Sequence, residues 1–198
     1  MARYIGPKIK ISRRFGVMLG LRTNESAFTK RPYKPGDHGP RGRRARVTEY
    51  GSQLAEKQKA KFIYGVLERQ FARYFGIASK SHDAGLALMQ ILETRLDTVV
   101  YRSGLTQTQN QARQFVTHGH VTVNGKKVNI PSFVVEPGMK IAVKPSIQKT
   151  IEDAPVPTNE MPVWLRRDGM TVEMLAIPTR DQIPSQVNEQ LIVEFYSR

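Results

Sequence analysis

Hydrophobic residues recur with a helical period over residues 48–80, which predicts two consecutive helices. Their apolar sides comprise Leu54, Phe62, Val66, Leu67, Phe71, Tyr74 and Phe75. The opposite sides carry Lys57, Lys59, Lys61, Arg69 and Arg73 against Glu56 and Glu68. Such a charged face is commonly just solvated surface, but this excess of cations also suits an anionic partner.

A third helix is predicted over residues 84–104, because Asp83 can cap its first turn. Its inward residues are expected to be Leu86, Leu88, Met89, Leu92, Leu96 and Val100. Leu105 to Thr117 predicts a further short helix, which Gly119 ends in a left-handed conformation. The outward residues of this helix are expected to be Gln107, Gln109, Asn110, Arg113 and Gln114.

Alternating hydrophobic and polar positions after residue 120 predict a small antiparallel sheet. Its turns are expected at Asn124-Gly125, Pro137-Gly138 and Asp168-Gly169, the first being the dipeptide typical of a type I′ hairpin. A proline-punctuated acidic loop follows over residues 151–162, and residues 188–196 are expected to be helical. The fold class is therefore α+β.

Residues 1–46 show neither a helical nor a strand period, because prolines and glycines interrupt them throughout. Interleaved arginines offer bidentate donors for phosphate, so this segment is expected to be an extended basic arm that becomes ordered on RNA. Tyr4, Phe15 and Tyr33 could stack on bases or pack locally, and the sequence favours neither.

Charge strengthens the case for an anionic partner. The chain of 198 residues has 31 Lys and Arg against 17 Asp and Glu, a net charge of +14. Residues 1–50 hold 13 basic and 3 acidic residues, whereas residues 151–198 reverse the balance with 4 and 8. Nucleic acid is the expected partner, and a membrane surface is disfavoured because no basic amphipathic helix is present.

Candidate catalytic and metal sites are weak. The chain has no cysteine, and among its four histidines only His118 and His120 are close in sequence, with no carboxylate nearby. No signal peptide or apolar run of about 20 residues occurs, so a cytoplasmic protein is expected. No catalytic residue, cofactor or metal is expected, and no small-molecule substrate or membrane partner.

Six blocks of the chain, in order, resemble the bacterial small-subunit ribosomal protein S-four family. They are residues 1–14, 30–40, 50–71, 95–105, 111–132 and 188–198. The resemblance implies a helical domain and a compact RNA-binding module of two helices on a small antiparallel sheet. It also implies direct binding to the 5′ domain of 16S rRNA, nucleation of the body of the 30S subunit, and an influence on translational accuracy. The implied neighbours are ribosomal protein S-five and mRNA near the path by which it enters.

Two departures from the family pattern matter. Many members hold zinc through cysteines of the arm, so this chain resembles the metal-free type, with His38 contacting RNA or backbone. The first helix of the module commonly carries several arginines, whereas residues 106–113 read TQTQNQAR and leave Arg113 as the only cation. Uncharged phosphate contacts are weaker, so we expect the arm and the first helices to contribute more of the affinity.

Two other functions are alternatives to a ribosomal protein. Arg95-Leu96-Asp97 faintly resembles the nucleophile motif of pseudouridine synthases, which often carry the same RNA-binding module. Those enzymes need a large catalytic domain, so Asp97 is interpreted as a structural residue paired with a nearby arginine or a helix N-terminus. A freestanding RNA chaperone is the second alternative, but the strongly basic arm favours permanent residence in a large RNA.

The predicted domains are a basic arm at 1–46, a helical domain at 47–92 joined by 180–198, and an RNA-binding domain at 93–179 whose core module covers about 93–156. The residues expected to bind RNA come from all three: Arg3, Lys8, Lys10, Arg13, Arg14, Lys30, Arg31, Lys34, His38, Arg41, Arg43, Arg44, Arg46, Tyr50, Gln53, Lys57, Gln58, Lys59, Lys61, Arg69, Arg73, Gln107, Thr108, Gln109, Arg113, His118, His120, Asn124, Lys126 and Lys127.

Overall fold

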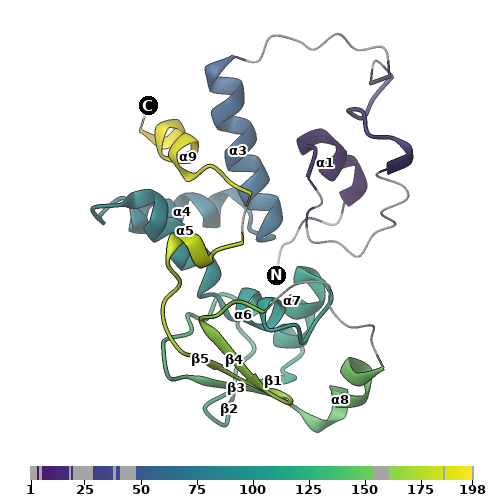
Figure 1. Cartoon of the computed structure of the whole chain (residues 1–198), viewed down its shortest axis with the longest axis vertical. Helices are drawn as coiled ribbons and strands as arrows, with labels where there is room; N and C mark the ends of the chain where they lie inside the picture. Colours follow the sequence, from purple (N-terminus) through teal and green to yellow (C-terminus); the bar gives the residue numbers. More distant parts are fainter. Residues whose placement is uncertain are drawn as a thin grey trace. The chain divides into compact units, whose positions relative to one another are not determined.

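The fold is α+β, as the sequence predicts (Figure 1). The computed structural model describes residues 4, 6–17, 19, 29–37, 39–40, 48–153, 161–184 and 186–197. Two compact units divide the chain: one contains residues 1–73 and 187–198, and the other contains residues 74–186. The three domains predicted from the sequence have other bounds and stay a prediction.

The first unit contains α1 (Lys8–Phe15), α3 (Glu49–Ile63), the start of α4 (Glu68–Ala78), and α9 (Glu189–Tyr196). Helix α9 packs along α3, although more than 120 residues separate them in sequence (Figure 1). Asn188 caps α9 by accepting hydrogen bonds from the backbone of Gln190 and Leu191. The two helices predicted over 48–80 and the C-terminal helix are therefore confirmed.

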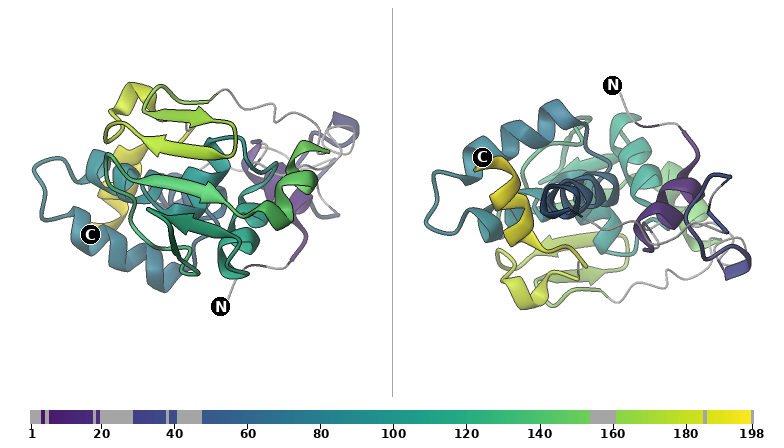
Figure 2. Two further views of the ribbon diagram at one scale, coloured as in Figure 1. Left: turned by 90° about the horizontal axis from the view of Figure 1, so that it is seen from below. Right: turned by 90° about the horizontal axis from the view of Figure 1, so that it is seen from above.

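The second unit packs helices on a five-stranded antiparallel sheet. Its helices are α5 (Ala84–Glu93), α6 (Leu96–Arg102), α7 (Gln109–Thr117), α8 (Pro145–Glu152) and the 3-10 turn η1 (Arg180–Gln182). Its strands are β1 (Val121–Val123), β2 (Lys126–Lys127), β3 (Lys140–Val143), β4 (Leu165–Asp168) and β5 (Thr171–Met174). They lie in the order β2-β1-β3-β5-β4, with the β4–β5 hairpin at one edge (Figure 2).

Side chains from α6, α7 and the strands form the core of the second unit. Leu96 and Val100 of α6 and Val116 of α7 meet Ile141 and Val172 of the sheet, all essentially inaccessible to water. Trp164 and Met174 close the same cluster. Burying apolar side chains of this size contributes about 1.5 to 3 kcal/mol each, so the core fixes the two helices on the sheet.

The turn predictions hold. Asn124 and Gly125 have φ of 47° and 78°, as a type I′ hairpin requires, and Gly138 and Gly169 also have positive φ. Asp83 caps α5 by accepting from the backbone of Leu86, and Gly119, with φ of 69°, follows the end of α7 in the left-handed region.

One helix prediction was wrong, and two helices were not predicted: α8, and α1, which lies in the segment expected to be an extended arm. Residues 84–104 form two helices, because the chain leaves the helix at Thr94 and Arg95 to pair with residues 131–135. The Val135 amide donates to the Thr94 carbonyl, and Arg95 and Val134 form an isolated antiparallel β-bridge. Helix α8 was not predicted; it begins with Pro145 at a position where proline costs no hydrogen bond, and it extends into the start of the predicted acidic loop.

Candidate nucleic-acid interface

Helix α1 presents a basic surface within the first unit. Lys10 and Arg14 are exposed, and Gly16 ends the helix with φ of 69°. Arg13 donates to the carbonyl of Tyr33 at 3.1 Å and lies over its ring at 5.0 Å. Arg13 therefore joins α1 to the later part of the arm. Lys8 is half-buried in the first turn of α1.

The remaining predicted arm residues fall into two groups. Lys30, Arg31 and Lys34 are exposed. Outside the described residues lie Arg3, His38, Arg41, Arg43, Arg44 and Arg46. Of the arm aromatics, Tyr4 and Phe15 contact the ring of Phe62 at 5.2 and 6.1 Å, which is local packing, while Tyr33 lies beside Arg13.

The charged face predicted for the first helices is partly internal. Lys57, expected on the outside, is 5% exposed: its ammonium lies 2.7 Å from Glu68 and 4.4 Å from the centre of the Phe195 ring. Helix α9 covers this position, which the local period could not reveal. Gln53 is also buried, and it donates to Glu194 of α9 at 3.1 Å.

Glu68 gathers several donors. Lys57, Lys61 and the Tyr196 hydroxyl all donate to its carboxylate. Burial by itself would raise the pKa of Glu68, but the hydrogen bonds from the two lysines outweigh it and hold the pKa below its ordinary value. Burial and the Glu68 charge raise the pKa of Tyr196. This cluster stabilises the packing of α3, α4 and α9.

The other predicted residues of α3 and α4 range from largely buried to exposed. Lys59 pairs with Glu56 at 3.0 Å, and Gln58 is half-buried. Tyr50 is 51% exposed and contacts the Phe195 ring. Arg69 and Arg73 are exposed, and neither forms an ion pair within the part of the chain that the structure describes.

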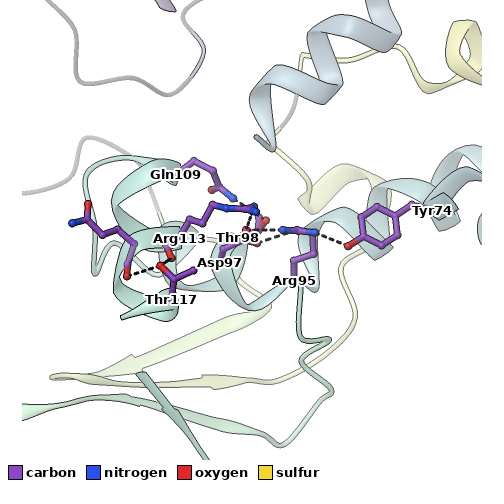
Figure 3. A network of polar contacts seen from close by, with 8 residues as sticks. Tyr74, Arg95, Asp97, Thr98, Gln109, Arg113 and Thr117 are labelled. Carbon is purple, nitrogen blue, oxygen red and sulfur yellow. Dashed lines mark hydrogen bonds and ion pairs between the residues drawn. The ribbon is translucent and has the colours of Figure 1, made fainter. Parts of the chain in front are cut away.

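In the second unit, a buried polar network lies beneath α7 (Figure 3). Arg95 donates to both Asp97 oxygens, at 2.9 and 2.6 Å, and to the Tyr74 hydroxyl. Arg113 approaches Asp97 at 3.4 Å. Burial would lower the pKa of Arg95, but the Asp97 charge outweighs it and raises the pKa. The prediction that Asp97 is structural and paired with an arginine is confirmed.

The start of α7 is fixed by its own side chains. Thr108 caps the helix by accepting from the Gln111 backbone at 3.2 Å, and Gln111 accepts from the Gln107 backbone at 3.0 Å. Gln109, predicted to point outward, is buried and donates to Thr98 at 3.1 Å, because this position faces α6. Gln109 therefore contributes to packing of the two helices in this conformation.

The hairpin presents a second basic surface. Lys126 and Lys127 are exposed on the edge strand β2, and His118 is exposed just before Gly119. Asn124 is exposed at the turn, and its side-chain oxygen accepts from the Lys140 backbone at 2.9 Å, which fixes the turn. His120 is half-buried, with its ring 6.0 Å from that of His118.

One cation in this region, Lys144, is not among the residues predicted to bind RNA. The backbone of Lys144 donates to the His120 carbonyl at 2.9 Å, continuing the β1–β3 ladder by one residue. Counting the ladder outward from the Val121–Val143 pair would have placed Lys144 beside His120, but the pairing of the two strands had first to be known.

The described residues contain no group of three or more histidines and carboxylates that could hold a metal ion. None of the helices in this part of the chain is long and apolar enough to cross a bilayer.

Comparison with known proteins identifies the family. Residues 3–93 match the family described as Ribosomal protein S4/S9 N-terminal domain, and residues 94–141 match the S4 domain. Curated relatives named small ribosomal subunit protein uS4 match over the full length of both chains. They include those of Roseiflexus castenholzii (49% identical), Aquifex aeolicus (48%) and Geobacillus stearothermophilus (49%). The chain therefore belongs to the family of small ribosomal subunit protein uS4.

Proposed function

We propose that this protein is a structural component of the small ribosomal subunit that binds the 5′ domain of 16S rRNA directly. Its mechanism is electrostatic and shape recognition of folded RNA, without turnover. Bound early, it helps to nucleate assembly of the body of the 30S subunit. It also contributes to translational accuracy near the path by which mRNA enters, beside ribosomal protein S-five.

The division of cations into two groups carries the proposal. Lys57, Lys59 and Lys61 form ion pairs with carboxylates of the first unit. By contrast, Lys10, Arg14, Arg69 and Arg73 of that unit are exposed, as are Lys126 and Lys127 of the second unit. Exposed cations that form no ion pair within the described residues repel one another, so an RNA that supplies phosphates stabilises this arrangement.

The alternative of a pseudouridine synthase finds no support in the site. Asp97 is 1% exposed and accepts both side-chain hydrogen bonds that Arg95 directs at it. A carboxylate held in this way cannot approach an RNA base as a nucleophile without breaking a buried ion pair.

The proposal is tested by measuring affinity for a fragment containing the 16S 5′ domain over a series of salt concentrations. Each phosphate contact contributes roughly 0.7 to 0.9 to the slope of log affinity against log salt, so we expect a slope of several units. A fragment of equal length from another 16S domain is the matched control. Equal affinity for both fragments, or a slope near zero, would contradict direct recognition.

Assembly and accuracy need separate measurements. Omitting the protein from reconstitution of 30S particles should prevent later proteins of the body from joining. Charge-removing variants at Arg69 or Arg73 that still fold should slow this step. We expect the acidic last quarter of the chain to face a protein neighbour or solvent, so crosslinks from Glu152 to Glu160 predominantly into rRNA would contradict that part of the proposal.

A further inference from the structure

Four residues lie where α7 passes into β1: His118, His120, Lys127 and Lys144, which we call the histidine corner. Gly119, in the left-handed conformation, turns the chain between the two histidines. The His120 backbone donates to the Phe115 carbonyl at 3.0 Å, which ties the turn to α7.

The two lysines flank this turn from different strands. The side chain of Lys127, from β2, occupies the space that a Cβ would need at Gly119, so its methylenes lie against the turn. Lys144 lies beside His120 from the end of β3, through the 2.9 Å backbone hydrogen bond. Antiparallel neighbours project from the same face of a sheet, so His120 and Lys144 are neighbours in space as well as in the ladder.

The two rings differ in how they are held. Phe115 meets His120 edge-on at 6.3 Å, and His120 is half-buried between this contact and the ladder. His118 is exposed and lies 6.0 Å from His120. His118 therefore offers a ring to a partner outside the protein, while His120 supports it from behind.

Charge around the corner is of one sign. No acidic residue occurs between Thr98 and Val135, and Asp97 is occupied by Arg95 and Arg113. Glu173 of β5 pairs across from Lys140, four residues along the chain from Lys144. An exposed aromatic ring near lysines is suited to binding an unpaired base together with its phosphate.

We propose that the histidine corner binds one unpaired nucleotide of the RNA, with the base stacked on His118 and the adjoining phosphate held by Lys127 and Lys144. This proposal rests on the proposed RNA-binding function and adds to it a specific subsite and one cation, Lys144, that the sequence did not indicate. Duplex RNA, whose bases are already stacked, does not fill the subsite.

The ring is tested with two substitutions at His118, using the 16S 5′-domain fragment. His118→Ala should weaken binding about 5- to 100-fold, the range for loss of one base–aromatic stack, with the salt slope unchanged at pH 8. His118→Phe keeps a stacking ring and should retain most of the affinity. If both variants bind as tightly as the wild type, or if His118→Phe is as weak as His118→Ala, base stacking on this ring is wrong.

The cation is tested with a matched pair on one strand. Lys144→Gln should reduce the salt slope by roughly 0.7 to 0.9, the value for one phosphate contact. Lys140→Gln removes the same charge from the other end of β3, opposite Glu173, and should leave the slope unchanged. Equal effects of the two substitutions would mean that only net charge matters and would overturn the subsite.

Short RNA oligonucleotides distinguish an unpaired nucleotide from backbone contact. His118→Ala should weaken binding of a single-stranded oligonucleotide and leave binding of the same sequence as a duplex unchanged. Weakening of both to the same degree would contradict the proposal. The wild type could bind the 5′-domain fragment with a steep salt slope while every corner variant behaves like the wild type. That result would contradict the subsite but leave the proposed function intact.

Discussion

Lys57 donates to Glu68 at 2.7 Å while its ammonium group lies 4.4 Å from the centre of the Phe195 ring. The pair joins α3 to α4, and the ring belongs to α9, so one cation stabilises three helices of the first unit. A charge this buried must keep its partners, because losing one leaves the other without solvation.

Replacing Lys57 with Met, which preserves most of its volume, should lower the free energy of unfolding by about 1 to 3 kcal/mol. The value lies below that of a fully buried pair because the Glu68 side chain is 45% exposed. Arg69→Met is the control, since Arg69 is exposed and forms no ion pair within the described residues, and it should cost under about 0.5 kcal/mol. Chemical denaturation measures both, and equal losses would contradict the role assigned to Lys57.

Stability should fall in acid partly through Glu68. The pKa of Glu68 in the folded protein lies below its ordinary value of 4.5, so its contribution is fully present above that pH and is lost as the pH falls through the lower, folded pKa. The difference in unfolding free energy between wild type and Glu68→Gln should therefore be constant from pH 7 to about 5 and shrink below that. A difference that stays constant to pH 3 would show that Glu68 is not held ionised by the lysines.

Asp97→Asn should destabilise the second unit by about 3 kcal/mol or more, because it leaves Arg95 buried without its counter-charge. The pattern of rRNA pseudouridines in cells carrying this variant should be unchanged. Denaturation followed by the fluorescence of Trp164, which is buried in the same unit, measures the first effect. A pseudouridine lost at a specific position would instead assign Asp97 a catalytic role.

Deleting residues 2–46 should flatten the salt dependence of binding to the 5′-domain fragment by several units, since each lost phosphate contact removes roughly 0.7 to 0.9. Trp164 fluorescence serves as the folding control, because this residue belongs to the other unit. A slope equal to that of the full chain would mean that the arm makes no phosphate contacts.

Local signals in the sequence predicted much of this fold. Asp83 marked the start of a helix, and Asn124-Gly125 marked a hairpin, because each feature is decided by residues within one turn of it. The break between α5 and α6 was missed because its cause lies elsewhere: the chain leaves the helix at Thr94 to pair with residues 131–135. Helical propensity was outweighed there by a tertiary contact.

The candidate site was predicted less well than the fold. Residue type identified cations suited to RNA, but it could not separate Lys57, which α9 covers, from Arg69 and Arg73, which stay exposed. The local period could not show that Gln109 faces α6. Lys144 was missed for the complementary reason, since its neighbour His120 is distant in sequence and becomes adjacent only through the β1–β3 ladder.

The packing of α9 on α3 also sets an order for folding during synthesis. All residues of the 74–186 unit precede α9 in the chain, so the first unit cannot be completed until α9 has been synthesised. The usual order, in which the N-terminal unit finishes folding first, is therefore not open to this chain. Lys57 lacks the aromatic rings that cover it until Phe195 and Tyr196 have left the ribosome.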